Sequence, residues 1–547
     1  MINNFYKTIC TVCVVGAFCA CSDWDDHYEN TSVDEGGSMT LWEQMKNTAE
    51  LSDFCDVLEQ TKVYRLHRKT PVSYAELLQG GQSFTVIAPV NGSFDKDSLI
   101  KLTQTVEGDS IVERFFVQNQ LSPSLTSITA DAVRMHMLNK KGMNIASGMI
   151  EGVSMNLVNK SFKNGLLHVS SKPLPYHYTI FEQLCADTSL AVVGNAIRFY
   201  DKEKFNEEAS VLDSVNADGE MVYVDSVFYQ SNILLNRIGL LKAEDSTYLV
   251  SVPTTAGWQK AWDEATSYFV YPKSEEKADS LQQLFTTRAL LEDAIFSRTT
   301  QTTPEDSLRS RFYDRLHPEY HVFHKPYEAG GIFYGAEEVK CSNGTVYKTS
   351  DWAFTPENTY FKLLRTEAED TWLIKQPVSD AENKVANCAY TVRQTGSDSI
   401  KASEGAYLHI KSVVPDNNWQ ITFNLKNTLS GAYDIYVVCL PHSVYEKKNP
   451  SPLPCRFKAS INYQDANGKL VGFKSLKGAK PAFETNPTQV DTVLIAQDFK
   501  FPVCDYYDSS TAQNVLLKLE RSVTAAQETK FNRELFLDCI ILKPKRQ

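Results

Sequence analysis

The strongest constraint on the fold of this chain is an ordered pair of short apolar stretches. The first is SFTVIAPVNGSF at residues 83–94, a strand of the buried type that Pro89 ends and that a turn at Asn91 follows. The second is FKNGLLHVSSKPLP at residues 162–175, where Asn164 begins an Asn-Gly turn before another apolar strand. An Asn-Gly pair between apolar runs is the strongest short signal of a hairpin. With residues at helical spacing before and between them, these stretches predict mixed α and β structure.

The same order occurs a second time further along the chain. STYLVSVPTTAGWQKAW at residues 246–262 has Pro253 in the place of the first proline, and VKCSNGTVYKTSDWAF at 339–354 has the turn Asn343-Gly344. The proline and the asparagine are 75 residues apart in the first copy and 90 in the second. A repeated order of elements indicates a duplicated unit, and the extra residues of the second copy are expected in loops.

These stretches resemble the fasciclin domain. Its first signature, T-V-F-A-P-T-N-x-A-F, is matched from Thr85 to Phe94, and its second, N-G-x-x-H-x-I-D, is matched at Asn164, Gly165 and His168. The resemblance implies a compact α+β fold with strands against a helical layer, in which His168 is a hydrogen-bonded structural residue. It also implies a role in adhesion or surface interaction without catalysis. Some members use a Tyr-His pair in adhesion, and the corresponding regions here, RFFVQNQL and LLEDAIF, lack it.

The C-terminal third changes to a two-residue period. Ile421, Phe423 and Leu425 alternate with polar residues, and the same alternation occurs in residues 433–439 and 457–463. Strands of this kind separated by turns predict a β-sandwich. The closing LFLDCIILKP resembles the last strand of galactose-binding-like jelly rolls, and such a fold does not by itself imply sugar binding.

The predicted fold class is therefore α+β, with two tandem fasciclin-like domains followed by an all-β jelly-roll sandwich. A chain of 547 residues is long enough for three or four domains. We expect five segments, namely a signal peptide at 1–20, an acidic tether at 21–39, fasciclin-like domains at 40–185 and 186–370, and the sandwich at 371–547.

The N-terminal segment MINNFYKTICTVCVVGAFCA predicts a lipoprotein signal peptide. Lys7 precedes an apolar run from Ile9 to Ala20, and a run of about 12 residues is shorter than the roughly 20 that a membrane span needs. A charged start, a short apolar centre and a small residue before the break are typical of secretory signals. Cys21 then becomes the lipidated N-terminus, and the alternative is an ordinary secreted protein that is cut nearby.

The residues after Cys21 predict where the protein is located in the cell. Ser22, Asp23, Asp25 and Asp26 resemble the acidic export signal of Bacteroidota surface lipoproteins. The resemblance implies an outer-membrane protein, lipid-anchored and facing the cell exterior. The alternative is a solvated tether without an address, because a polar acidic stretch of this kind stays extended in water.

Charge and cysteine usage narrow the partners. The net charge is −12 and the chain has no basic cluster, which argues against nucleic acid as a partner. Eight cysteines follow Cys21, and none of them forms a CxxC pair. We therefore expect buried thiols and neither a zinc ribbon nor a disulfide framework.

No motif predicts catalysis, a metal or a cofactor. HPEYHVFHKPYE places His317, His321 and His324 close together, as zinc ligands would be, but prolines flank the segment and a loop or strand edge is the expected reading. Asp505 and Asp508 have the composition of a glycosidase pair without the required separation being evident. G-x-S-x-G, H-E-x-x-H and P-loop motifs are absent from the sequence.

One group of residues suits sugar binding. Trp419 stands at the start of a predicted strand, and Tyr506 and Tyr507 follow Asp505 in the loop CDYYDSS. Aromatic rings stack on the apolar faces of sugars while neighbouring polar groups bind hydroxyls. These four residues are the predicted ligand platform, and the alternative is that Trp419 caps the sandwich core.

The sequence thus predicts a non-catalytic surface lipoprotein with no cofactor. One hypothesis is a ligand-binding accessory module beside an outer-membrane glycan or peptide uptake system, which would make a transporter complex its partner. The other is structural cell adhesion, in which the fasciclin-like domains bind neighbouring surface proteins or matrix. Glycoside hydrolysis is disfavoured.

Overall fold

The computed structural model describes residues 38–65, 68–215, 221–298, 306–314, 319–375, 387–396, 400–446, 448, 451–476, 482–507 and 514–546. The chain divides into two compact units, Met1–Tyr178 and Thr179–Gln547. Cys21 and the export-signal residues Ser22, Asp23, Asp25 and Asp26 lie outside the described residues. No helix in the described part combines the length and the apolar character needed to cross a membrane.

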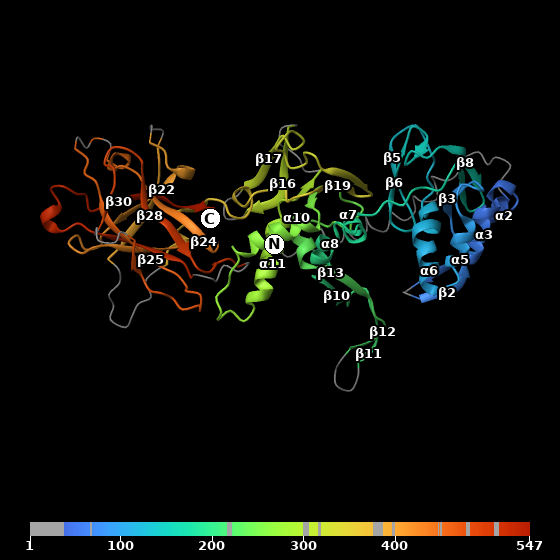
Figure 1. The fold of residues 1–547 in the computed structure, drawn as a ribbon, viewed down its shortest axis with the longest axis horizontal. Helices are drawn as coiled ribbons and strands as arrows, with labels where there is room; N and C mark the ends of the chain where they lie inside the picture. Colours follow the sequence, from blue (N-terminus) through green and yellow to red (C-terminus); the bar gives the residue numbers. More distant parts are fainter. Residues whose placement is uncertain are drawn as a thin grey trace, which may run out of the picture. The chain divides into compact units, whose positions relative to one another are not determined.

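The first unit is an α+β repeat (Figure 1). Its main sheet has the order β4-β3-β9-β8, in which β3 and β9 run parallel and the outer pairs are antiparallel. A second sheet has the order β5-β6-β7. The elements are α2 (Leu41–Lys46), α3 (Ser52–Gln60), β1 (Lys62–Arg65), β2 (Arg68–Ser73), α4 (Tyr74–Gln79), β3 (Phe84–Pro89), α5 (Lys96–Leu102), α6 (Val106–Val112), β4 (Leu121–Ser122), β5 (Val133–His136), β6 (Gly142–Ala146), β7 (Met149–Ile150), β8 (Met155–Phe162) and β9 (Gly165–Ser170).

The second unit begins with another copy of this repeat. The sheet order is β15-β14-β19-β18, again with the two central strands parallel and the outer pairs antiparallel. The elements are α7 (Ile180–Ala186), α8 (Ala191–Arg198), β10 (Asp201–Phe205), β11 (Val211–Val215), β12 (Met221–Asp225), β13 (Phe228–Asn232), α9 (Ile233–Ile238), β14 (Tyr248–Pro253), α10 (Thr255–Thr266), α11 (Ala278–Leu291), β15 (Ile295–Ser297), β16 (Ser307–Asp314), β17 (Glu319–His324), β18 (Glu337–Cys341) and β19 (Gly344–Thr349).

One asparagine connects three parts of each repeat. In the first, the Asn164 side chain accepts a hydrogen bond from the amide of Leu41 at 2.8 Å and donates to the carbonyls of Leu78 (2.7 Å) and Gly80 (3.0 Å). It therefore satisfies an amide at the start of α2 and carbonyls at the end of α4, groups that a helix cannot pair internally.

Asn343 makes the same three bonds in the second repeat. Its side chain accepts from the amide of Ile180 at 2.8 Å and donates to the carbonyls of Leu241 and Ala243, both at 2.9 Å. The first helix of each copy also begins with a capping box, Thr40 with Glu43 and Thr179 with Glu182. The internal repeat is thus present at the level of single hydrogen bonds.

The glycines after these asparagines are required by both backbone conformation and space. Gly165 and Gly344 have φ of 148° and 144°. A Cβ atom at Gly165 would lie 1.9 Å from the carbonyl oxygen of Phe84, and at Gly344 it would lie 1.9 Å from that of Tyr248. These glycines let the two central strands approach with Phe84 opposite Gly165 and Tyr248 opposite Gly344.

The remaining signature residues hold loops against the sheet. Thr85 donates to the carbonyl of Ser124 (2.7 Å), and the Asn91 side chain accepts from the amide of Asp53 (2.9 Å). Pro89 and Pro253 each end the first central strand of their repeat. The second copy has no asparagine at the turn after Pro253, which is why its first signature is the weaker match.

His168 lies fully buried beside the same sheet. Its Nδ1 accepts the amide of Asn159 at 3.0 Å, and its Nε2 lies 3.1 Å from the carbonyl of Thr126. This pattern needs a neutral ring with the proton on Nε2, and burial lowers the pKa of His168 accordingly.

The sandwich packs two antiparallel sheets. One has the order β21-β22-β30-β24-β28 with β20 also paired to β30, and the other has the order β23-β29-β25-β26 with β27 paired to β25. The strands are β20 (Leu364–Glu367), β21 (Ala389–Gln394), β22 (Ala406–Lys411), β23 (Gln420–Asn424), β24 (Gly431–Cys439), β25 (Arg456–Asn462), β26 (Lys474–Ser475), β27 (Phe483–Glu484), β28 (Asp491–Phe501), β29 (Leu516–Arg521) and β30 (Leu535–Lys545). The predicted fold class, an α+β repeat pair followed by an all-β sandwich, is confirmed.

Two expected boundaries need correction. Helix α7 was assigned to the first domain by the boundary between 185 and 186, but it packs in the second repeat, because Asn343 binds its first turn and the chain divides after Tyr178. The sandwich was expected to begin at 371, yet β20 already pairs with its last strand, Leu364 opposite Leu542.

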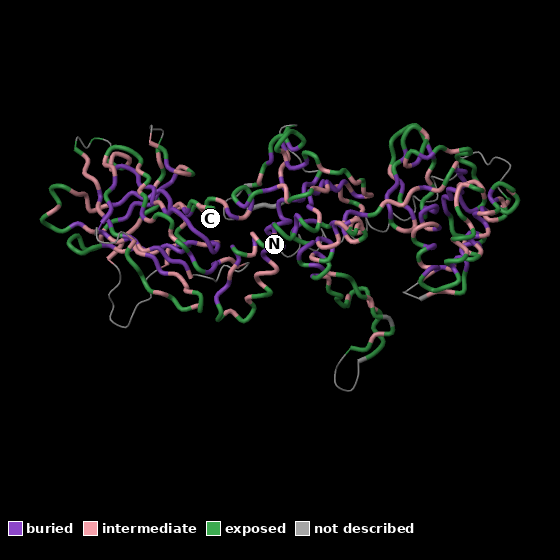
Figure 2. Tube along the Cα trace, in the orientation of Figure 1, coloured by how far each residue is buried: buried purple, intermediate pink, exposed green. Residues whose placement is uncertain are grey.

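The second repeat and the sandwich share one apolar core. Phe269, Phe285 and Phe361 from the repeat belong to the same buried cluster as Tyr433 and Phe501 of the sandwich. Figure 2 shows this buried material in purple along the sandwich strands. The sandwich therefore packs directly against the second repeat and is not an independent domain joined only by a linker.

Candidate functional site

The predicted ligand platform does not exist as an exposed surface. Trp419 is 0% exposed and belongs to the sandwich core, and its indole N–H donates to the carbonyl of Arg533 at 2.8 Å. Burial with a satisfied N–H is the usual arrangement of a core tryptophan. The prediction that Trp419 binds a ligand is thus wrong, and the alternative that it caps the core holds.

Asp505 also faces inward. Its carboxylate accepts the amide (3.1 Å) and the side-chain N–H (3.0 Å) of Asn514, and its own amide donates to the carbonyl of Thr428 at 2.7 Å. Burial raises the pKa of this carboxyl, with the bonds from Asn514 opposing the rise. Asp505 therefore fixes a loop of the sandwich, and Asp508 lies outside the described residues.

The two tyrosines join the sandwich to the second repeat. Tyr506 packs edge-on against Phe269 and Phe285, with ring centroids 5.6 and 5.1 Å apart. Tyr507 packs against Tyr271 at 5.4 Å, and the Tyr271 hydroxyl donates to the carbonyl of Tyr506 at 2.6 Å. Both tyrosines are half-buried in this junction and do not form a platform with Trp419.

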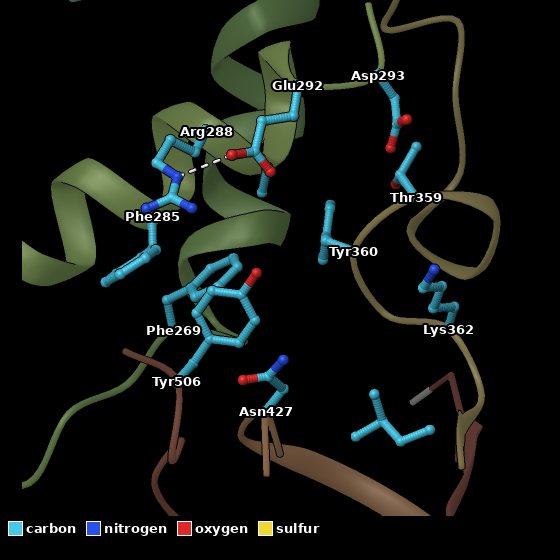
Figure 3. A pocket seen from close by; sticks show the side chains of 12 residues that line it. Phe269, Phe285, Arg288, Glu292, Asp293, Thr359, Tyr360, Lys362, Asn427 and Tyr506 are labelled. Atoms are coloured by element: carbon cyan, nitrogen blue, oxygen red, sulfur yellow. Dashed lines mark hydrogen bonds and ion pairs between the residues drawn. The ribbon is translucent and has the colours of Figure 1, made fainter. Parts of the chain in front are cut away.

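A small cavity of about 60 Å³ lies at the junction, lined by α11, the segment before β20 and two loops of the sandwich (Figure 3). This volume is well below the ~300 to 1,000 Å³ of typical small-molecule sites. On one side, the guanidinium of Arg288 donates to Glu292 at 2.9 Å, and Arg237 forms a second ion pair with the same carboxylate.

A second series of hydrogen-bonded polar side chains, Asp293, His321 and Lys362, lies on the other side of the cavity. His321 Nδ1 lies 2.8 Å from Asp293 Oδ2, and the ammonium of Lys362 lies 2.6 Å from His321 Nε2. The geometry suits a neutral imidazole that donates to Asp293 and accepts from Lys362. The other oxygen of Asp293 is buried without a hydrogen-bond partner among the described residues. The cavity has room for water, and the charged groups beside it pair with one another within the second repeat.

The two described histidines of the predicted trio have different partners. His321 turns toward Asp293, whereas His324 Nδ1 lies 2.7 Å from the hydroxyl of Ser307. The two residues are three positions apart on β17, so their side chains leave opposite faces of the strand. His317 lies outside the described residues.

A different cluster has the geometry of a cation site. Ligand atoms of Glu367, Asp538 and Cys539 lie within 4.8 Å of one another, where β20 pairs with β30. One oxygen each of Glu367 and Glu369 is buried without a hydrogen-bond partner in the part of the chain that the structure describes. Burial raises the pKa of Glu369 to about 7 and that of Asp538 to about 6.

Oxygen donors of this kind suit a hard cation such as Ca²⁺. The Cys539 thiol suits it less, because burial raises its pKa and keeps it protonated. Sequence reasoning missed this cluster since Glu367 and Asp538 are far apart in the chain, although the acidic run TEAED, which begins in β20, indicated part of it.

Two exposed aromatic side chains of the sandwich were also missed. Trp372 is 57% exposed, and the ammonium of Lys426 lies 4.3 Å from its ring centroid. Tyr445 is exposed as well, stacks against Phe536 at 5.8 Å and has the Arg393 guanidinium 4.5 Å from its ring. Trp372 and Tyr445 thus have the exposed rings and charged neighbours that were expected of the predicted platform, but they lie at other positions in the sequence.

Comparisons with known proteins identify no family. No protein-family model matches the chain, and no curated protein is significantly similar to it. Among solved structures, a FAS1 domain pair from the insect cell adhesion molecule fasciclin I matches at 11% identity and a TM-score of 0.18, covering 51% of this chain and 90% of that one.

Two carbohydrate-binding domains match the chain in similar terms. A family 35 carbohydrate binding module from Clostridium thermocellum has 11% identity and a TM-score of 0.19, covering 34% of this chain and 99% of its own. A xylan-binding domain of family 22 has 12% identity and a TM-score of 0.17, covering 30% of this chain and 90% of its own. TM-scores this low do not establish a function.

Proposed function

We propose that this chain is a non-catalytic, lipid-anchored protein of the outer-membrane surface that captures a ligand beside a glycan or peptide uptake system. Cys21 and the acidic residues after it supply the expected anchor and address. Two chains of a lipid anchor are enough to hold a soluble body at a membrane.

Trp372 carries the ligand part of the proposal. Trp372 exposes 57% of its surface just after β20, so part of its ring is available for an apolar sugar face to stack on. The shared core behind it fixes the sandwich on the second repeat, so the ring is presented by a rigid body. A sugar face on the ring, with Lys426 beside it, fits this arrangement.

A glycan array on the purified chain tests this proposal. We expect binding that weakens about tenfold in Trp372→Ala, since an aromatic contact contributes roughly 1 to 2 kcal/mol. Trp352→Phe is the matched control, because that half-buried ring packs inside the second repeat against Phe354. An array without any bound glycan, or binding that Trp372→Ala leaves unchanged, contradicts glycan capture.

Structural adhesion to neighbouring surface proteins or matrix is the second candidate. An exposed apolar extension of the second fasciclin-like repeat favours it, because apolar surface of that extent marks protein contacts. Co-purification from detergent-solubilised membranes separates the two candidates. A transporter recovered with the chain supports uptake, whereas other surface proteins without a transporter support adhesion.

A further inference from the structure

The second repeat carries an extension that the first repeat lacks. Between α8 and α9 the chain forms two successive pairs of strands, β10 with β13 and then β11 with β12, which we call the β-arm (Asp201–Asn232, described except for 216–220). At the same place in the first repeat, between α3 and α4, stands only the short hairpin of β1 and β2. The β-arm is therefore an insertion that the repeat fold does not need.

The base of the β-arm is anchored, but its length is not covered. Asn232 caps α9 and donates to the carbonyl of Ile197 and the carboxylate of Asp201, each at 2.8 Å. Beyond this base the ribbon leaves the helices (Figure 1), and Figure 2 shows it as mainly exposed. Each pair is a sheet of two strands, so both outer edges lack a strand partner among the described residues.

The exposed surface of the β-arm is apolar. Val224 is 71% exposed, and other large apolar side chains along the ribbon expose between 39% and 56% of their surface: Phe205, Val211, Leu212, Met221, Val222, Phe228 and Tyr229. The aromatic contacts within the ribbon are local, with Phe205 against Tyr223 and Phe228. Two-stranded ribbons are marginal in water without a packed face, and a contiguous apolar patch marks a binding surface.

The charge of the β-arm identifies the partner. The described residues of the β-arm include six acidic residues and two lysines, and both lysines lie at its base, in a chain whose total net charge is −12. Two such arms repel each other, and an anionic lipid surface repels them too. Acidic side chains interleaved with apolar ones complement an apolar groove bordered by basic groups.

We propose that the β-arm inserts into an apolar groove, bordered by lysine and arginine side chains, on a second protein different from this chain. The exposed ribbon edges supply main-chain hydrogen bonds to that protein, and the valines and phenylalanines fill its groove. The inference requires a protein partner, as in adhesion or an uptake complex. It depends neither on sugar binding nor on the lipid anchor.

A defined probe tests the chemistry on the purified chain. The probe is a fluorescent peptide of about ten residues that alternates valine and lysine, and its control alternates valine and glutamate. We expect the lysine peptide to bind, and to bind at least about tenfold more weakly to the Glu208→Lys/Asp213→Lys variant or at high salt. Asp97→Lys/Glu107→Lys, which reverses two exposed acidic residues of the first unit, should bind as the parent does. Equal binding by both peptides or all variants overturns the proposal.

A photo-crosslinking amino acid then locates the partner on cells. Placed at Val224 it should yield a crosslink to one protein of different mass, and the Glu208→Lys/Asp213→Lys change should abolish that crosslink without altering thermal unfolding. Val413, 65% exposed in the sandwich, is the control position. A crosslink to a second copy, to lipid alone or to nothing overturns the proposal. If the anchor fails its own test while peptide binding persists, only the proposed location is wrong.

Discussion

The hydrogen bonds of Asn343 give the sharpest test of how the second repeat is held together. Asn343 is fully buried and joins β19 to the amide of Ile180 and the carbonyls of Leu241 and Ala243. Asn343→Ala removes all three bonds at once. It leaves the Ile180 amide buried without a partner, whereas the Leu241 carbonyl still accepts the amide of Phe181 at 3.3 Å and Ala243 is partly exposed and finds water.

The expected cost follows from these three bonds. A buried polar group left without its partner costs about 1 to 3 kcal/mol, and an ordinary hydrogen bond contributes about 0.5 to 1.5 kcal/mol, so the orphaned amide and the two lost carbonyl bonds together cost about 2 to 6 kcal/mol. Native domains are stable by about 5 to 15 kcal/mol. Asn343→Ala should therefore remove a large part of the stability of the second unit, and we expect a loss near 4 kcal/mol.

Asn424 provides a matched control with the opposite expectation. It is buried like Asn343, but both polar atoms of its side chain lack hydrogen-bond partners among the residues that the structure describes. Asn424→Leu keeps the shape of the side chain and removes an uncompensated desolvation cost, so we expect no loss or a gain of up to about 1 kcal/mol. Asn164→Ala repeats the experiment in the first unit, where the bonds are the same.

Urea unfolding of the full chain, followed by tryptophan fluorescence and circular dichroism, measures these changes. Asn343→Ala should lower the midpoint of the transition that belongs to the second unit, and Asn164→Ala that of the first. A loss below about 1 kcal/mol in Asn343→Ala, or an equal loss in Asn424→Leu, would refute the reasoning, because burial alone would then explain the effect.

Three further predictions follow from single sites. Trp419→Ala should destabilise the second unit by about 3 to 5 kcal/mol in the same urea assay. A loss below about 1 kcal/mol would contradict the burial of Trp419 in the core. Burial lowers the pKa of His168, so the neutral ring stabilises the first unit above about pH 6.5, and this contribution is lost as the pH falls. In His168→Gln the melting temperature of the first unit should therefore depend less on pH between about pH 7.5 and pH 5. Calcium should raise the melting temperature of the parent but not that of Asp538→Asn, and equal shifts would place calcium elsewhere.

The turns and strand ends of the repeats could be predicted from the sequence because each depends on one or two residues. The Asn-Gly turns and the prolines that end strands act over a few positions, so their effect does not depend on the rest of the fold. The start of the second repeat was also readable, since Thr179 and Glu182 form the T-x-x-E pattern of a capping box. This capping box lies just before the expected boundary at 185 and marks the start of the second repeat more accurately.

The candidate site was harder to predict because it depends on burial and on distant pairs. Trp419 continues the two-residue series of Ile421 and Phe423, so its side chain belongs on the core face, and the pattern contained this information. The residues around Trp372 show neither strand alternation nor helical spacing, so the sequence does not predict whether its side chain is exposed or buried. The alternation in VLDSV and MVYVD predicts strands, but only the structure shows that Val211, Leu212 and Val224 stay exposed on them.

Cell fractionation with Cys21→Ala tests the central claim, that this chain works as an anchored protein at the cell surface, most directly. The parent should sediment with the outer membrane and be cut by protease added to whole cells, whereas the variant should appear in the soluble fraction with unchanged folding by circular dichroism. A variant that partitions with membranes as the parent does, or a parent that whole-cell proteolysis never reaches, would contradict the account.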